Sequence, residues 1–164
     1  MMNFLIIFSA KYLIALSVLG LVVYFFTSKK LDRKRFLIYF GLVCVFSFII
    51  AKISSYFIYD PRPFVVNHFM PLIPHANDNG FPSDHTLLAM AIAMSVYFYN
   101  IEVVTSFAYN KKWGIGLFIL GVLIGLSRVV AGVHHIEDIL GSIVIAGVVA
   151  VVINYIYLKI NKNN

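Results

Sequence analysis

Three clusters of polar residues interrupt a largely apolar sequence, and their side chains suit chemistry on a phosphate. The clusters occupy Asp60–Phe64, Phe81–His85 and Ser127–Asp138. An arginine guanidinium donates paired hydrogen bonds that match the oxygens of a phosphate. Arg62 and Arg128 come from different clusters, so together they could neutralise one dianionic phosphoryl group. The first and third clusters therefore indicate a phosphate-binding site.

The second cluster stands where a helix is expected to begin. Ser83 is a favourable residue for the N-terminal cap of a helix. The first backbone N–H groups of a helix have no partner within it and favour a bound anion. We therefore expect Ser83 and the start of this helix to help hold the phosphate.

The third cluster contains a histidine and an aspartate at helical spacing. His134 and Asp138 lie four residues apart, so they share one face of a helix that begins near His134. A carboxylate beside an imidazole fixes its tautomer and stabilises the imidazolium. The other ring nitrogen can then attack phosphorus and form a phosphohistidine. His85 can protonate the leaving group as a general acid.

The elements that must position these residues are transmembrane helices. The chain has 164 residues, of which 61% are hydrophobic and 12% charged, whereas soluble domains average about 25% charged residues. About 20 apolar residues cross a bilayer as a helix. We predict a single domain over residues 1–164, an all-α polytopic bundle of about five transmembrane helices. The expected helices are Phe4–Thr27, Phe36–Tyr59, His85–Ile101, Trp113–Val130 and Ile139–Lys159.

The first of these apolar runs is interrupted by a lysine. It is either a short span from Tyr12 or a longer one in which Lys11 extends toward the surface. We expect four helices to surround the phosphate pocket and the first to lie at the periphery.

The loop charges predict the orientation of the bundle. The net charge is +6, but the basic residues lie in short connections between apolar runs, which argues against a nucleic-acid partner. Nine of the thirteen Lys and Arg residues fall in segments 28–35 and 111–112 and in the C-terminal tail, so that side is predicted to be cytoplasmic. All five prolines lie on the other side, within segment 60–84. We expect this segment to cover an extracytoplasmic site as a partial lid.

The three clusters together resemble the type-2 phosphatidate phosphatase superfamily of membrane lipid phosphatases. Its pattern is Lys-x6-Arg-Pro, then Pro-Ser-x-His, then Ser-Arg-x5-His-x3-Asp, and the resemblance extends over about Lys52–Gly141. It implies an enzyme without a metal or other cofactor. By this resemblance the nucleophile is His134, its partner is Asp138 and the general acid is His85. The implied phosphate ligands are Arg62, Ser83, Arg128 and Ser127.

One position departs from that pattern. The lysine of the first motif should stand at Ser55, but the nearest lysine is Lys52, about one helical turn further from the loop. Lys52 is therefore either a phosphate ligand that reaches the site through its long side chain or a structural residue that extends to the membrane surface.

Further details resemble one bacterial branch of the superfamily, the undecaprenyl-diphosphate phosphatases. They are Asp84 within the second motif, the run Pro74–Phe81 before it and the short five-helix layout. The resemblance implies hydrolysis of undecaprenyl diphosphate to undecaprenyl phosphate and phosphate, at the outer face of a bacterial inner membrane. The substrate is then a lipid of the bilayer, and the sequence leaves the oligomeric state open.

Several other interpretations stay open at this point. Phosphatidylglycerophosphate, phosphatidate or lipid A phosphate are alternative substrates within the superfamily. A transporter, or a lipid-binding protein without activity, represents a different class. A zinc site is a further alternative, but two arginines would repel a divalent cation. His68 and His75 are interpreted as anchors at the membrane interface.

Overall fold

The computed structural model describes residues 2–29, 31–99 and 107–162, and within these ranges it is helical. The sole β-pairing there is an isolated antiparallel bridge between Pro61 and Asn79. The all-α prediction is therefore confirmed. The helices are α1 (Met2–Thr27), α2 (Arg33–Phe57), α3 (Pro63–Val66), α4 (Asp84–Phe98), α5 (Phe107–Val130) and α6 (Ile136–Lys162).

Four of these helices are long and apolar enough to cross a membrane. They are α1, α2, the Lys111–Val130 part of α5 and the Ile136–Ile160 part of α6. The fifth, α4, has 15 residues and is about 22 Å long at 1.5 Å per residue, short of a bilayer core roughly 30 Å thick. The protein is thus an integral membrane protein whose described residues form four long helices and one shorter apolar helix. Asn100 and Ile101, predicted to continue the third helix, lie outside the described residues.

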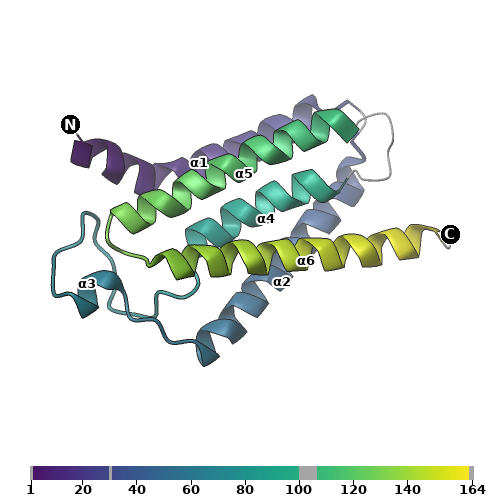
Figure 1. The fold of residues 1–164 in the computed structure, drawn as a ribbon. Coiled ribbons are helices and arrows are strands. Elements are labelled where there is room, and N and C mark those ends of the chain that lie inside the picture. Colours follow the sequence, from purple (N-terminus) through teal and green to yellow (C-terminus); the bar gives the residue numbers. More distant parts are fainter. Residues whose placement is uncertain (1, 30, 100–106, 163–164) are drawn as a thin grey trace.

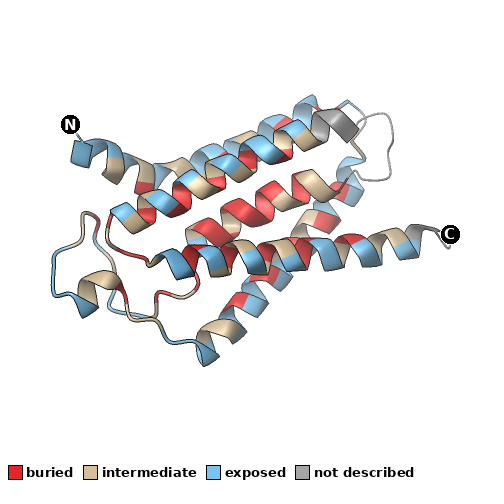
Figure 2. Cartoon of the chain, in the orientation of Figure 1, coloured by how far each residue is buried: buried red, intermediate tan, exposed pale blue. Residues whose placement is uncertain are grey.

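Helix α4 forms the centre of the bundle. It packs against α1, α2, α5 and α6, and Figure 2 shows buried residues along most of its length. A helix that is hydrophobic on all sides is stable only when it is surrounded. Close contact with α5 requires glycine, since a Cβ at Gly114 would lie 2.7 Å from the Cβ of Tyr97. The short helix that carries His85 is therefore held rigidly by its neighbours.

Helix α1 lies at the edge of the bundle, as predicted. It is one continuous helix from Met2, and Lys11 is exposed on it. Only 11% of its most apolar stretch of 18 residues is buried inside the protein. Ala10 is an exception, because it is buried and its backbone oxygen accepts a hydrogen bond from Arg128. A peripheral helix thus touches a residue of the expected site.

The segments that carry the three clusters meet at one end of the bundle. Figure 1 shows the α2–α4 connection, with α3, beside the turn between α5 and α6. The backbone N–H of Leu72 donates to the oxygen of Ala131 at 3.0 Å, and that of Gly80 donates to Asp60 at 2.8 Å. The end of α1, the start of α2 and the end of α6 lie at the other end. This arrangement agrees with the prediction that segment 28–35 and the C-terminal tail lie on one side of the membrane and segment 60–84 on the other.

Candidate active site

A polar cavity of about 410 Å³ lies where these segments meet. Its walls come from α2, the α2–α4 connection, the start of α4, the end of α5 and the residues before α6. The polar residues that line it are Lys52, Ser55, Arg62, His75, Asp78, Asn79, Asp84, His85, Arg128 and His134. The structure thus brings together both arginines and both histidines that the sequence predicted to surround one anion.

His134 and Asp138 form a buried pair at the cavity wall. The Nδ1 atom of His134 lies 3.0 Å from the Oδ2 atom of Asp138, and the same oxygen accepts the backbone N–H of His135 at 2.9 Å. Helix α6 begins at Ile136, so His134 precedes it and still reaches its first turn. An acceptor at Nδ1 places the proton there. Nε2 is then unprotonated, and its lone pair can accept a hydrogen bond or act as a nucleophile.

The electrostatics of the site keep that lone pair available. Burial lowers the pKa of His134, and the charge of Arg62 acts in the same direction. The hydrogen bond that His134 donates to Asp138 raises the pKa but does not outweigh these two effects. The imidazole therefore stays neutral in the pH range where ordinary histidines begin to protonate. A neutral imidazole is the form that can attack phosphorus.

Arg62 is fixed on several sides at the nucleophile. Its Nη1 atom donates to the backbone oxygen of Val133 at 2.7 Å and lies 3.3 Å from the Nε2 of His134. Its Nε atom donates to the Oδ1 atom of Asp78 at 2.7 Å, and its Nη2 atom donates to the backbone oxygen of Asn79 at 3.4 Å. A buried guanidinium in one fixed position is prepared to bind an oxyanion beside that ring nitrogen.

Arg128, in the last turn of α5, is a buried cation with few partners. It is 4% exposed, and its Nη1 atom donates to the backbone oxygen of Ala10 at 3.2 Å. Among the described residues no carboxylate lies within ion-pair distance, and its Nε atom has no hydrogen-bond partner. An uncompensated buried charge is costly. A phosphate in the cavity would satisfy both the charge and the free donor.

The start of α4 reaches the cavity through Asp84 and His85 and not through Ser83. Asp84 and His85 line the cavity, whereas Ser83 is fully buried and does not. The hydroxyl of Ser83 accepts a hydrogen bond from Thr86 at 3.1 Å, and its backbone N–H donates to the oxygen of Asp138 at 3.3 Å. Ser83 thus connects α4 to α6, and the structure does not place it in contact with the phosphate position.

The structure does not bring Ser127 into the cavity either. Its hydroxyl donates to the backbone oxygen of Ile124 at 2.7 Å, a common bond for serine within a helix. Lys52 is exposed and does line the cavity. At Ser55, where the family pattern has its lysine, the Asn79 side chain donates to both the backbone oxygen and the hydroxyl. The α2–α4 connection therefore occupies the space beside Ser55, and Lys52 lies about one turn earlier in α2.

The cavity also contains residues to which the sequence analysis gave no role in the site, among them a histidine and an aspartate of the α2–α4 connection. His75 was interpreted as an interfacial anchor, and Asp78 received no role, yet both line the cavity. Their position between the first two clusters was a weak signal for a place near the site. Among the described residues, no three His, Cys, Asp or Glu side chains are grouped as metal ligands.

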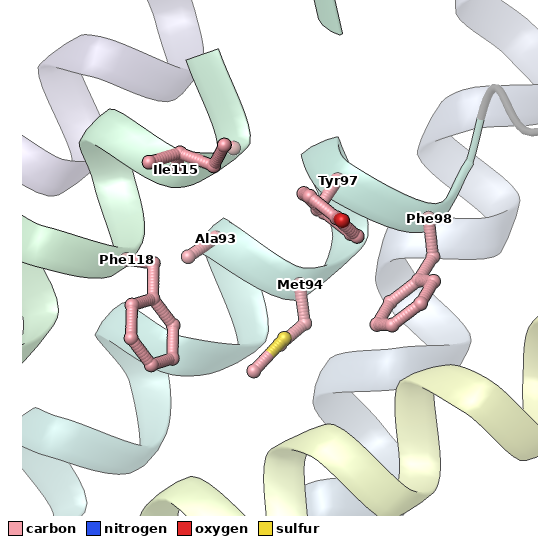
Figure 3. Close-up of a pocket in the computed structure, with 7 residues that line it drawn as sticks. Ala93, Met94, Tyr97, Phe98, Ile115 and Phe118 are labelled. Atoms are coloured by element: carbon pink, nitrogen blue, oxygen red, sulfur yellow. The ribbon is translucent and has the colours of Figure 1, made fainter. Parts of the chain in front are cut away.

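A second cavity differs in character and position. It has a volume of about 280 Å³ and lies between α4 and α5, where Figure 3 shows the side chains around it. It is lined by Ala93, Met94, Tyr97, Phe98, Gly114, Ile115 and Phe118. These residues supply no charged group, so this cavity offers no phosphate chemistry.

The fold and the site define a helical membrane protein with a polar cavity lined by two arginines and two histidines from separate segments. The PAP2 superfamily model matches residues 36–162, and the chain belongs to this superfamily. It is 34% identical over 155 residues to undecaprenyl-diphosphatase BcrC of Bacillus subtilis, covering 94% of this chain and 72% of the relative. Membership in this family makes the protein a membrane lipid phosphatase.

Two further relatives differ in their names. The bacitracin transport permease protein BcrC of Bacillus licheniformis is 33% identical over 140 residues, covering 85% of this chain and 64% of that protein. The crystal structure of a transmembrane PAP2-type phosphatidylglycerolphosphate phosphatase from Bacillus subtilis matches with a TM-score of 0.66 at 25% identity. That match covers 97% of this chain and 78% of the other. The fold is thus that of a PAP2 transmembrane phosphatase.

Proposed function

We propose that this protein hydrolyses undecaprenyl diphosphate to undecaprenyl phosphate and phosphate through a phosphohistidine at His134. The observation that carries the proposal is the placement of the Nε2 atom of His134. It lies 3.3 Å from a guanidinium nitrogen of Arg62, while Asp138 holds the opposite ring nitrogen at 3.0 Å. A nucleophile beside a cation that can hold its electrophile is what phosphoryl transfer requires.

The reaction proceeds in two displacements. In the first, Nε2 of His134 forms a bond to the terminal phosphorus while the bond from phosphorus to the bridging oxygen breaks. His85, which takes up a proton as the anionic phosphoryl group binds beside it, gives that proton to the bridging oxygen, and undecaprenyl phosphate leaves. In the second, the oxygen of a water molecule forms a bond to phosphorus while the bond from phosphorus to Nε2 breaks, His85 accepts a proton from the water, and phosphate departs. Asp138 stabilises the imidazolium, and Arg62 and Arg128 hold the phosphoryl oxygens.

The charge of the cavity supports a diphosphate substrate. Lys52, Arg62 and Arg128 line it, against the acids Asp78 and Asp84. A diphosphate carries more negative charge than a phosphate monoester and can engage all three cations. The name of the 34% identical relative points in the same direction. Phosphatidylglycerophosphate, phosphatidate and lipid A phosphate are the alternative substrates, and the first is favoured by the name of the structural neighbour.

We further propose that residues 1–164 act as one domain in a bacterial inner membrane, with the cavity on the extracytoplasmic face. The loop charges support this orientation. The lipid chain would remain in the bilayer, since an apolar chain gains nothing by leaving it. The Nδ1–Asp138 bond, which fixes a nucleophilic tautomer, favours hydrolysis over transport or lipid binding alone.

Phosphate release from a panel of purified lipids tests this function. The panel contains undecaprenyl diphosphate, phosphatidylglycerophosphate, phosphatidate and lipid A phosphate, each assayed with and without a chelator. We expect the highest kcat/KM for undecaprenyl diphosphate, no effect of the chelator, and no activity in His134→Ala. His68→Ala, which changes an exposed histidine of the same end, is the matched control and should retain full activity. A faster reaction on another lipid would overturn the substrate, and an active His134→Ala would overturn the mechanism.

A further inference from the structure

The carboxylate of Asp78, in the α2–α4 connection, places an oxygen atom beside Arg62. The Oδ1 atom of Asp78 lies 2.7 Å from the Nε of Arg62 and 3.8 Å from the Nδ1 of His75. The Asp78 side chain is 59% exposed, whereas that of Arg62 is 5% exposed. Burial raises the pKa of Asp78, but the hydrogen bond and charge of Arg62 outweigh it and lower the pKa. An anionic oxygen therefore sits between a guanidinium and an imidazole.

The imidazole on the other side of that oxygen has unused hydrogen-bonding capacity. His75 lines the cavity, and its ring centroid lies 6.0 Å from that of His134. Its Nδ1 atom is buried and has no hydrogen-bond partner among the described residues. A buried polar atom without a partner is unfavourable. A ligand that offers an oxygen to Nδ1 would remove this cost.

The loop around Asp78 is anchored, so its side chain can move without the backbone. The Oδ1 atom of Asn79 accepts the backbone N–H groups of Asp60 and Phe81, at 2.9 and 3.1 Å. Its Nδ2 atom donates to the backbone oxygen of Ile58 at 2.8 Å. The exposed Asp78 carboxylate can be hydrated when it leaves the ion pair, and the buried Arg62 stays compensated if another anion takes its place. The oxygen of Asp78 can therefore be exchanged for another while Arg62 stays in place.

We propose that a phosphoryl oxygen of the substrate takes over the position of the Asp78 Oδ1 atom, so that His75 is a further phosphate ligand and Asp78 a competitor. The proposal rests on the phosphatase reaction, and it concerns the phosphoryl group that is transferred. His75 adjoins the nucleophile His134, whereas the leaving group lies on the far side of the phosphorus. Loss of His75 should therefore impair all substrates equally, regardless of their leaving groups.

Vanadate binding to the purified full chain tests this proposal without relying on any substrate. Vanadate raises the melting temperature of a protein to which it binds, and a titration of that shift gives its Kd. We expect His75→Ala to weaken binding about 10- to 150-fold, the range for a hydrogen bond to a charged group. His75→Asn, whose amide nitrogen stands near the place of Nδ1, should recover part of this loss. Asp78→Asn should tighten binding about threefold or more, because a like charge is removed.

The matched control is His68→Ala, since His68 is an exposed histidine in the same loop and does not line the cavity. It should bind vanadate as the wild type does. The proposal is overturned by a wild type that does not bind vanadate, by an unchanged Kd in His75→Ala, by no recovery in His75→Asn or by weaker binding in Asp78→Asn. Inactivity of the wild type toward every lipid of the panel would refute the proposed function, while the vanadate comparison would still decide this one.

Discussion

The replacement Asp138→Asn tests how the nucleophile is prepared. The Oδ2 atom of Asp138 is fully buried and binds both His134 and the backbone N–H of His135. Asparagine has nearly the same shape, so the fold should persist. Its amide oxygen can still accept from His134 and from the backbone N–H of His135. A neutral amide, however, stabilises the imidazolium that forms during attack less than a carboxylate does.

The size of the effect follows from the lost interaction. A hydrogen bond to a charged group contributes about 1.5–3 kcal/mol, which corresponds to roughly 10- to 150-fold in rate. The carboxylate also stabilises the imidazolium that forms as phosphorus is attacked, so the upper part of this range applies. We expect kcat to fall by about 100-fold, while KM changes little because Asp138 does not line the cavity.

Steady-state phosphate release from undecaprenyl diphosphate measures this effect. Glu137→Gln is the matched control, because it removes an exposed carboxylate from the same turn of α6. The control should keep at least half of the wild-type kcat. A kcat for Asp138→Asn within threefold of the wild type, or an equal fall in Glu137→Gln, would refute the reasoning.

Two other predictions concern the same part of the site. A Cβ at Gly80 would lie 2.9 Å from the Oδ2 atom of Asp138, so Gly80→Ala should displace this carboxylate and lower kcat about tenfold. The control is Gly41→Ala, whose Cβ would meet nothing within 4 Å and which should leave kcat unchanged. Equal activity of the two variants would contradict this. Because burial lowers the pKa of His134 while Asp138 raises it, NMR titration should give a value below 6.5 in the wild type and a lower one in Asp138→Asn. A wild-type value above 6.5, or a rise in the variant, would oppose the electrostatic account.

Much of the fold and the convergence of the site could be predicted from the sequence. Apolar runs of bilayer length located the long helices, and the first helix begins at Met2, close to the expected Phe4. The two arginines and two histidines could be placed together because each stands at a helix end on the same side of the bundle. The depth of a residue along a transmembrane helix follows directly from its position in the run.

Contacts within the connecting segment could not be predicted in this way. His75 and Asp78 reach the cavity because Asn79 anchors the loop to the end of α2, and no periodicity reveals that contact. Ser127 stands beside Arg128 in sequence, yet its hydroxyl bonds to its own helix. Ser83 likewise bonds to Thr86. Hydroxyl groups often choose local partners, and the sequence does not distinguish these from a ligand.

The central claim is that His134 forms a covalent bond to phosphorus. Rapid alkaline quenching of the enzyme with undecaprenyl diphosphate labelled at its terminal phosphate, followed by peptide mass spectrometry, tests it most directly. We expect an acid-labile, alkali-stable phosphate on the peptide that contains His134. In His85→Ala, with a substrate that has a good leaving group, this phosphate should be retained longer. Label on another residue, or its persistence in His134→Ala, would contradict the account.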